Sequence, residues 1–211
     1  MSHLSLQTAP GKDTARGPAP AVAAPPGIGA TIWLTGLPSA GKTTIAHAVA
    51  DLLRAEGRRV EVLDGDVARE TLTADLGFSR ADRDRNVERI GYVAALLAKH
   101  GVVVLASVIS PFAAARDSVR ARHAASGLPF AEVHVATPVG VCAARDVKGL
   151  YARQRTGEIS GLTGVDDEYE PPLAPELRLD TDGRTVADSA DAVLRLVPGS
   201  HPESGHQGAA R

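Results

Sequence analysis

The chain has 211 residues, with 23 lysines and arginines against 25 aspartates and glutamates, which gives a formal net charge of −2. This length predicts one domain, and the near-neutral charge argues against a protein that wraps nucleic acid. The single cysteine, Cys142, excludes an intrachain disulfide and a multi-cysteine zinc site, and it is typical of proteins from a reducing cytoplasm. No apolar run reaches the roughly 18 residues of a membrane span, so we expect neither a membrane nor a nucleic acid as a partner.

Both ends of the chain differ in composition from its middle. Residues 1–29 and 198–211 are rich in Pro, Gly, Ala and small polar residues. Such segments carry too few apolar side chains to offset the entropy of ordering them. We therefore predict a disordered tail at each end and one folded domain over residues 30–197.

Between these tails, short apolar runs alternate with amphipathic segments. Runs typical of buried strands cover residues 31–35, 60–64, 102–107 and 131–136, and helical patterns follow Lys42, Asp84 and Phe112. Strands that alternate with helices form right-handed crossovers, so the pattern predicts an α/β fold with a mostly parallel sheet flanked by helices on both faces. Ligands bind at the carboxyl ends of such strands.

A phosphate-binding motif directly follows the first predicted strand. Residues 36–43 read GLPSAGKT, which matches G-x-x-x-x-G-K-[ST], a loop whose backbone N–H groups and following helix N-terminus cradle a polyphosphate. Lys42 can reach the β- and γ-phosphates, and the Thr43 hydroxyl can bind Mg²⁺. The strand before the motif and the amphipathic helix after it favour a nucleoside triphosphate site over a chance glycine-rich turn.

Two carboxylates follow one another at the end of the second predicted strand. Asp64 and Asp66 flank Gly65, and Arg69 comes three residues later. Opposite a phosphate-binding loop, such a pair suits magnesium binding and activation of an acceptor hydroxyl. Asp66 has an alternative role as the cap of the following helix, so Asp64 is the better catalytic candidate.

A charged segment introduces the second helical pattern. Arg83 and Asn86 are three residues apart and share a helix face. A guanidinium group can bind an oxyanion with two N–H groups, and an amide can bond to a base or a ribose. Phe78 stands where an aromatic base could stack. The alternative is a solvated helix start with Phe78 in the core, and the residues alone do not separate the two.

The third predicted strand leads into Ser107, Ser110 and Pro111. We expect Pro111 to open a helix at its first position. Ser110 could cap that helix, contact an acceptor or act as a nucleophile. Capping is the commonest fate of such a serine, and no nearby His or Lys in the sequence would activate it.

Residues 145–172 combine several glycines with mixed charges and show no clean period. Long irregular segments in compact domains are commonly lids or binding loops. A kinase needs such a lid to keep water from the γ-phosphate. Arg145 and Lys148 would then lie among phosphates or against adenine. The alternative is an extended surface loop.

With these segments in order, the chain resembles the adenylyl-sulfate kinase family. The resemblance covers about residues 30–197 and rests on GLPSAGKTT, LDGD with Arg69, LGFSRADRDRNVERIGYVA, VISPF and RDVKGLYARQRTGEISGLTGVDDEYEPPLAPEL. It implies a P-loop kinase fold with a lid at about residues 145–172. It also implies Mg²⁺-dependent transfer of the ATP γ-phosphoryl group to the ribose 3′-hydroxyl of adenosine 5′-phosphosulfate, in sulfate activation, commonly by a homodimer.

The resemblance also implies roles for individual residues. Lys42, Asp64 and Ser110 would be catalytic, with Asp64 as base or metal organiser, and magnesium would be held by Thr43 and Asp64. The family describes the serine of ISP as a phosphoserine intermediate, which direct in-line transfer does not require. ATP would contact Gly36, Leu37, Pro38, Ser39, Ala40, Gly41, Lys42, Thr43, Thr44 and Arg145. The sulfonucleotide would contact Asp66, Arg69, Phe78, Arg83, Asn86, Ile109, Ser110, Lys148 and Leu162.

Leu162 is a departure from the family pattern. The family usually has Phe at this position, where the ring stacks on the substrate adenine. Loss of an aromatic face would weaken binding by about 1 kcal/mol. The substitution removes no group that handles phosphate.

Two other functions fit parts of the sequence. A small-molecule P-loop kinase of the gluconate or shikimate type shares the phosphate-binding loop and explains Asp64, but it does not require the GFS-x-x-DR-x-x-N and DVKGLY motifs. A catalytically silent nucleotide-binding regulator on the same fold predicts the loss of Lys42, Thr43 or Asp64, and all three are present.

Overall fold

The computed structural model describes residues 29–200. The two predicted tails lie outside the described residues, except for residue 29 and residues 198–200. Those last three residues pack on the domain, because Arg58 Nη2 donates to the Pro198 carbonyl at 3.1 Å and Ser200 is buried.

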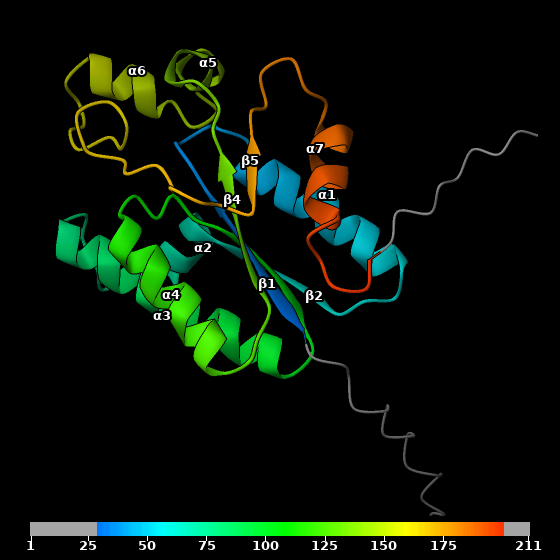
Figure 1. Ribbon diagram of the computed structural model, residues 1–211. Coiled ribbons are helices and arrows are strands. Elements are labelled where there is room, and N and C mark those ends of the chain that lie inside the picture. Colours follow the sequence, from blue (N-terminus) through cyan, green and yellow to red (C-terminus); the bar gives the residue numbers. More distant parts are fainter. Residues whose placement is uncertain (1–28, 201–211) are drawn as a thin grey trace, which may run out of the picture.

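A five-stranded parallel sheet forms the centre of the fold, with its strands in the order β2-β3-β1-β4-β5 (Figure 1). The predicted α/β fold with a parallel sheet is therefore confirmed, and the four predicted strands agree with the structure to within one residue at each end. The strands are β1 Ala30–Thr35, β2 Val60–Asp64, β3 Val103–Ser107, β4 Phe130–Val135 and β5 Leu177–Leu179.

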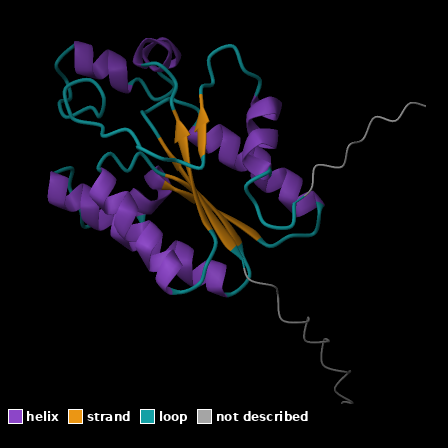
Figure 2. Ribbon diagram, viewed as in Figure 1, coloured by secondary structure: helices purple, strands orange, loops and turns teal. Residues whose placement is uncertain are grey.

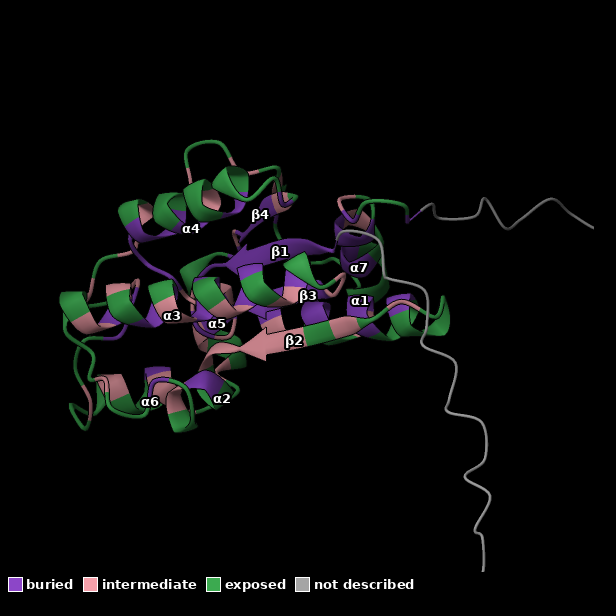
Figure 3. Cartoon of the chain, turned by 90° about the horizontal axis from the view of Figure 1, so that it is seen from below, coloured by how far each residue is buried: buried purple, intermediate pink, exposed green. Residues whose placement is uncertain are grey.

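The central strand β1 is buried along its whole length, and its side chains alternate between the two faces of the sheet. Ile32 and Leu34 join the core cluster that includes α1 and α7, whereas Trp33 joins the cluster that includes α3 and α4. Figure 3 shows the consequence, with β1 buried and the edge strand β2 only partly covered. The long helices that cover the sheet are α1 Lys42–Ala55 and α7 Val186–Leu194 on one face, and α3 Arg80–Lys99 and α4 Ala113–Ala125 on the other.

Two predicted helix starts differ from the structure. Helix α3 begins at Arg80 and not after Asp84, because Ser79 Oγ accepts a hydrogen bond from the Asp82 N–H at 3.2 Å and caps the helix there. The prediction that Pro111 opens the next helix is wrong. Helix α4 begins at Ala113, in agreement with the helical pattern predicted after Phe112, and the Ala113 N–H is capped by a carboxylate from a distant segment.

Helices α5, α6 and α7 and strand β5 have no counterpart among the predictions, and α2 was expected only as the helix that Asp66 would cap. Helices α5 and α6 lie beyond the carboxyl ends of the strands, among the loops that Figure 2 shows in teal. Helix α6 gives regular structure to part of the segment expected to be irregular. The short elements are α2 Gly65–Glu70, α5 Val139–Arg145, α6 Leu150–Arg155 and the three-residue strand β5. No helix within residues 29–200 has the length and apolar character needed to cross a membrane.

Candidate active site

A cavity of about 650 Å³ lies at the carboxyl ends of the central strands, within the size range of nucleotide and drug-sized ligands. Its walls come from the phosphate-binding loop, α2, the start of α3, the loop after β3, the lid and the segment before α7. The predicted site residues that line it are Pro38, Ser39, Gly41, Lys42, Thr43, Thr44, Asp66, Arg69, Phe78, Arg83, Asn86, Ile109, Ser110, Arg145 and Lys148. The predicted residues outside this wall are Gly36, Leu37, Ala40, Asp64 and Leu162.

The phosphate-binding loop runs tightly against the sheet. Gly36 has φ +148°, and a Cβ there would lie 2.4 Å from the Val135 carbonyl oxygen, so only glycine allows this passage. The buried Lys42 Nζ donates to the carbonyls of Gly36 at 3.0 Å and Leu37 at 2.8 Å. Burial lowers the pKa of Lys42 to about 8. A phosphate group at this position would give the buried ammonium a negatively charged partner.

Thr43, Asp64 and Ser107 meet beside this loop. Thr43 Oγ1 donates to Asp64 Oδ2 at 2.7 Å and lies 2.9 Å from Ser107 Oγ. The other Asp64 oxygen accepts the Asp66 N–H at 2.8 Å, so Asp64 is the N-cap of α2. The alternative role of Asp66 as that cap is therefore wrong, and the Asp66 side chain pairs with Lys148 of the lid.

The donor atoms in this corner fit a hard cation. Thr43 and Asp64 offer a hydroxyl and a carboxylate oxygen, and within residues 29–200 no group of three or more His, Cys, Asp and Glu side chains could hold a metal ion. Mg²⁺ typically binds through one or two carboxylates together with substrate phosphates and water. These residues thus suit magnesium that arrives with a nucleotide, and do not suit a metal caged by protein alone.

Phe78 stands at the mouth of the cavity. Its side chain is 71% exposed, so the alternative of a core position is wrong. The Arg69 guanidinium stacks on the ring at 4.6 Å from the centroid, and Arg69 Nη1 donates to the Gly77 carbonyl at 2.6 Å. The Arg83 guanidinium lies 5.7 Å from the same centroid. The exposed part of the ring is suited to stack on a flat aromatic ligand.

Arg83 is buried and binds mainly to protein. It donates to the carbonyls of Phe78 at 2.9 Å and Gly161 at 2.8 Å, to Thr163 Oγ1 at 3.0 Å, and to Asp167 Oδ2 at 2.9 Å. A guanidinium has five N–H donors, so these four bonds leave one for a ligand. Arg83 therefore ties the lid to α3, a role that the sequence did not indicate.

The other predicted residue of the α3 face, Asn86, is also buried against the cavity. Its Oδ1 lies 2.8 Å from Thr73 Oγ1. Because Arg83 and Asn86 both line the cavity, the predicted shared face of α3 is confirmed.

The lid turn packs against the phosphate-binding loop. Gly164 has φ +83°, and a Cβ there would lie 2.3 Å from Leu37 Cδ2. Leu162 is buried in the core cluster and does not line the cavity. In this arrangement Leu162 stabilises the base of the lid, and its side chain has no face open to a ligand.

Arg145, at the start of the lid, is linked to the phosphate-binding loop through Thr181. Arg145 donates to Thr181 Oγ1 at 2.7 Å and to the Thr181 carbonyl at 2.9 Å, and Thr181 Oγ1 in turn donates to the Ala40 carbonyl at 3.1 Å. The segment before α7 was not predicted to contribute. It adds the cavity residues Thr181, Arg184 and Thr185, and the first turn of α7 adds Val186 and Ser189. The only sequence signal there was the turn-forming DTDGRT stretch before a capped helix.

Ser110 lies in the cavity wall with its hydroxyl turned to the sheet. It is 1% exposed and has φ +41°. Its Oγ accepts the Trp33 indole N–H at 3.0 Å and lies 3.4 Å from the Val108 carbonyl. The prediction that Ser110 caps a helix is wrong, and neither partner of its hydroxyl is a base that would activate a nucleophile.

Comparison with known proteins identifies similar chains. A family model described as adenylylsulphate kinase matches residues 28–180. A probable adenylyl-sulfate kinase of Synechocystis sp. is 54% identical over 169 residues, which cover 80% of this chain and 93% of the relative. The Mycobacterium tuberculosis APS kinase solved with AMPPNP and APS has a TM-score of 0.79 and 46% identity, covering 81% of this chain and 98% of that one. A hexameric APS kinase from Thiobacillus denitrificans has a TM-score of 0.59 and 35% identity, covering 80% of this chain and 28% of that one.

The pKa of Lys42 predicts how nucleotide binding depends on pH. A polyphosphate binds the protonated ammonium, so affinity should be constant below pH 8 and fall by up to tenfold per pH unit above it. Titration calorimetry with ATP between pH 7 and 9.5 measures this dependence. Lys42→Arg is the control, because its side chain stays charged. An equal decline in both proteins would contradict the role of Lys42.

The geometry of Ser110 predicts that it does not become phosphorylated. We expect no label on Ser110 when the protein is incubated with ATP labelled in its γ-phosphate, because no base activates the hydroxyl. Acid quenching and peptide mass spectrometry detect such a label, with Ser110→Ala as the blank. A label on Ser110 that is lost when an acceptor is added would refute this prediction.

Proposed function

The chain belongs to the adenylylsulphate kinase family, and we propose that it transfers the γ-phosphoryl group of ATP to the ribose 3′-hydroxyl of adenosine 5′-phosphosulfate (APS). The products are 3′-phosphoadenosine 5′-phosphosulfate and ADP, as sulfate activation requires. The observation that carries this proposal is the single cavity that joins the phosphate-binding loop to Phe78, Arg83 and Asn86. One wall suits a triphosphate and the other suits a second nucleotide.

We infer that the nucleotide end binds ATP through the phosphate-binding loop. Lys42 would exchange its contacts with the Gly36 and Leu37 carbonyls for the β- and γ-phosphates. Backbone N–H groups of the loop and the N-terminus of α1 add positive partial charge. Arg145 and Thr181 lie on the far side of the loop, where they would contact the adenosine part of ATP.

We infer that Thr43 and Asp64 hold the Mg²⁺ that accompanies ATP. When bound, this ion neutralises charge on the β- and γ-phosphate oxygens. Because Asp64 accepts one hydrogen bond from Thr43 and another from the Asp66 N–H, it is fixed beside the loop. This arrangement supports the role of metal organiser for Asp64 more than that of a mobile base.

The acceptor end would bind APS by stacking and by polar contacts. The exposed face of Phe78 suits the adenine ring, with Arg69 beneath it. The remaining N–H of Arg83, the Asn86 amide and Lys148 would bind ribose and phosphosulfate groups. Ile109 and Ser110 also line this cavity. Positioning of the 3′-hydroxyl in line with the γ-phosphate would then supply most of the rate.

We also propose a cytoplasmic homodimer. The family resemblance supports a dimer, and the single cysteine and the use of ATP support a reducing cytoplasm. Equilibrium sedimentation is expected to give twice the chain mass of 21.8 kDa. A mass of one chain, or of six chains as in the hexameric relative, would rule the dimer out.

The proposed reaction predicts a narrow acceptor range. In a coupled assay of ADP release with Mg-ATP, we expect turnover with APS and none with AMP, gluconate or shikimate. Lys42→Ala should lower turnover by about 10²–10³-fold, because it removes a preorganised positive charge from the transferred group. Chelation of Mg²⁺ should abolish turnover in the wild type.

The same panel distinguishes the rival functions. Turnover with gluconate or shikimate would replace APS by another acceptor and keep the nucleotide site. Tight ATP binding without turnover on any acceptor would indicate a nucleotide-binding regulator. Either result would overturn the proposed reaction.

A further inference from the structure

The turn between β3 and α4 adopts a conformation that needs support. Ser110 has φ +41°, a region that side chains with a Cβ rarely occupy. Residues 109–111 all line the cavity, so the strain lies in the cavity wall. From β1, Thr35 Oγ1 donates to the Ile109 carbonyl at 2.7 Å, and the Trp33 indole donates to Ser110 Oγ at 3.0 Å. The sheet thus fixes one side of the turn.

Arg116 of α4 fixes the other side. Its side chain is 2% exposed and makes three hydrogen bonds of 2.7 Å each. Nη1 donates to the Ser110 carbonyl, Nη2 to the Glu170 carbonyl, and Nε to Glu132 Oε1, whose charge compensates the buried cation. One buried guanidinium therefore joins the strained turn to the end of the lid.

The end of the lid is bound to the same turn by further contacts. The Glu170 N–H donates to the Pro111 carbonyl at 2.8 Å, and Glu170 Oε2 accepts the Ala113 N–H at 2.7 Å, which caps α4. The Tyr169 hydroxyl lies 3.1 Å from Thr35 Oγ1. The turn and the lid end are thus held as one unit, and Arg116 is the charged group at its centre.

We propose that Arg116 is a positioning residue for the acceptor, which holds the residue 109–111 wall and the end of the lid in the geometry that APS requires. This inference rests on the proposed function. Arg116 does not line the cavity, so it would act through the Ser110 and Glu170 carbonyls. The phosphate-binding loop is held by other side chains, among them Tyr151, which donates to the Pro38 carbonyl, and Thr137, which donates to the Ala40 carbonyl. Loss of Arg116 should therefore affect the acceptor and spare ATP.

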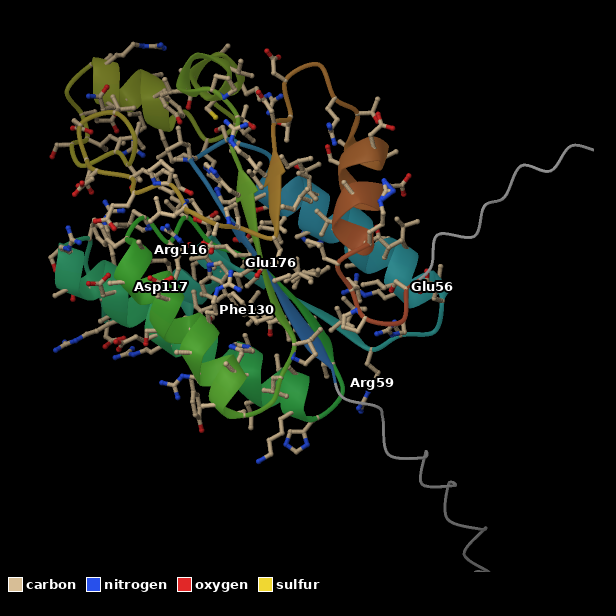
Figure 4. The ribbon with its side chains drawn as sticks, viewed as in Figure 1. Glu56, Arg59, Arg116, Asp117, Phe130 and Glu176 are labelled. Atoms are coloured by element: carbon tan, nitrogen blue, oxygen red, sulfur yellow. The ribbon has the colours of Figure 1, made fainter. Side chains whose placement is uncertain are left out.

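Arg120, one turn further along α4, offers a matched control. It also approaches Glu132, at 3.4 Å, and it forms a two-bond pair with Glu176 at 2.5 and 2.8 Å. Figure 4 labels Arg116 and also Glu176, the partner of Arg120. Arg120 bonds to neither the turn nor Glu170. Its replacement tests whether loss of any arginine from this face of α4 has the same effect.

The kinetic test compares Arg116→Met, Arg116→Lys and Arg120→Met with the wild type. We expect Arg116→Met to raise the KM for APS or lower kcat/KM for APS by about 100-fold, with the KM for ATP unchanged, because misplacement of a substrate wall has effects of this order. Arg116→Lys keeps the charge beside Glu132 and should fold even where Arg116→Met does not. Its three N–H donors all lie on one nitrogen, which cannot reach the three acceptors that Arg116 meets from three separate nitrogens, so an intermediate loss is expected. Arg120→Met should lower the Tm and leave both KM values unchanged.

A second measurement does not depend on turnover. Trp33 is the only tryptophan of the chain, and its indole N–H binds Ser110 in the strained turn. We expect the emission of Trp33 to shift, and its quenching by acrylamide to increase, in both Arg116 variants and not in Arg120→Met. A wild type that fails to phosphorylate APS would refute the proposed function, while Trp33 would still report on the turn.

Two outcomes would overturn the proposal. In the first, Arg116→Lys has the same Trp33 emission as the wild type. If the protein phosphorylates APS, this variant also has the wild-type KM for APS. In the second, Arg116→Lys and Arg120→Met change Trp33 emission or both KM values to the same extent, which would assign Arg116 a general role in stability.

Discussion

The register of three parallel strands, whose carboxyl ends lie side by side, determines the rest of the site. In register, Asp64 of β2 and Leu34 of β1 both pair with Ser107 of β3. The chain therefore leaves β1, β2 and β3 at one edge, where Thr43, Asp64 and Ser107 come within hydrogen-bond distance. A shift of one residue in this register would turn each strand's side chains to the opposite face. The proposed magnesium corner exists because the buried runs of the sheet fix that register.

Buried cations in this protein differ in what balances their charge. Arg116 has the carboxylate of Glu132 as a permanent partner, and Arg83 has Asp167 of the lid. The contacts of Lys42 are backbone carbonyls, and burial lowers its pKa to about 8. A buried lysine that lacks a carboxylate partner is costly in the free protein and favourable once a phosphate arrives. This contrast distinguishes Lys42, which is suited to bind an anionic ligand, from Arg116 and Arg83, which stabilise the fold.

The sequence predicted the residues that belong to a local motif or a local spacing, although it did not show their distant partners. The phosphate-binding loop, Asp64 and the α3 face of Arg83 and Asn86 follow from local spacing. Strand β5 has only three residues, too few to show a period. Arg116 could not be assigned because its acceptors lie 6, 16 and 54 residues away and two of them are backbone carbonyls. The misplacement of Ser110 as a cap has the same cause, since the true cap of α4 comes from Glu170.

The contacts that hold residues 145–172 differ in burial along the segment. Arg83 and Arg116 bind its later part through buried hydrogen bonds, and Gly164 packs on Leu37. The start of the lid crosses the cavity mouth through the exposed Lys148–Asp66 pair, and exposed ion pairs of this kind contribute about 1 kcal/mol or less. Opening at this pair therefore costs less than release of either arginine. The part of the cavity wall that Arg83 forms, and the turn that Arg116 supports from behind, are therefore the more firmly held parts of the site.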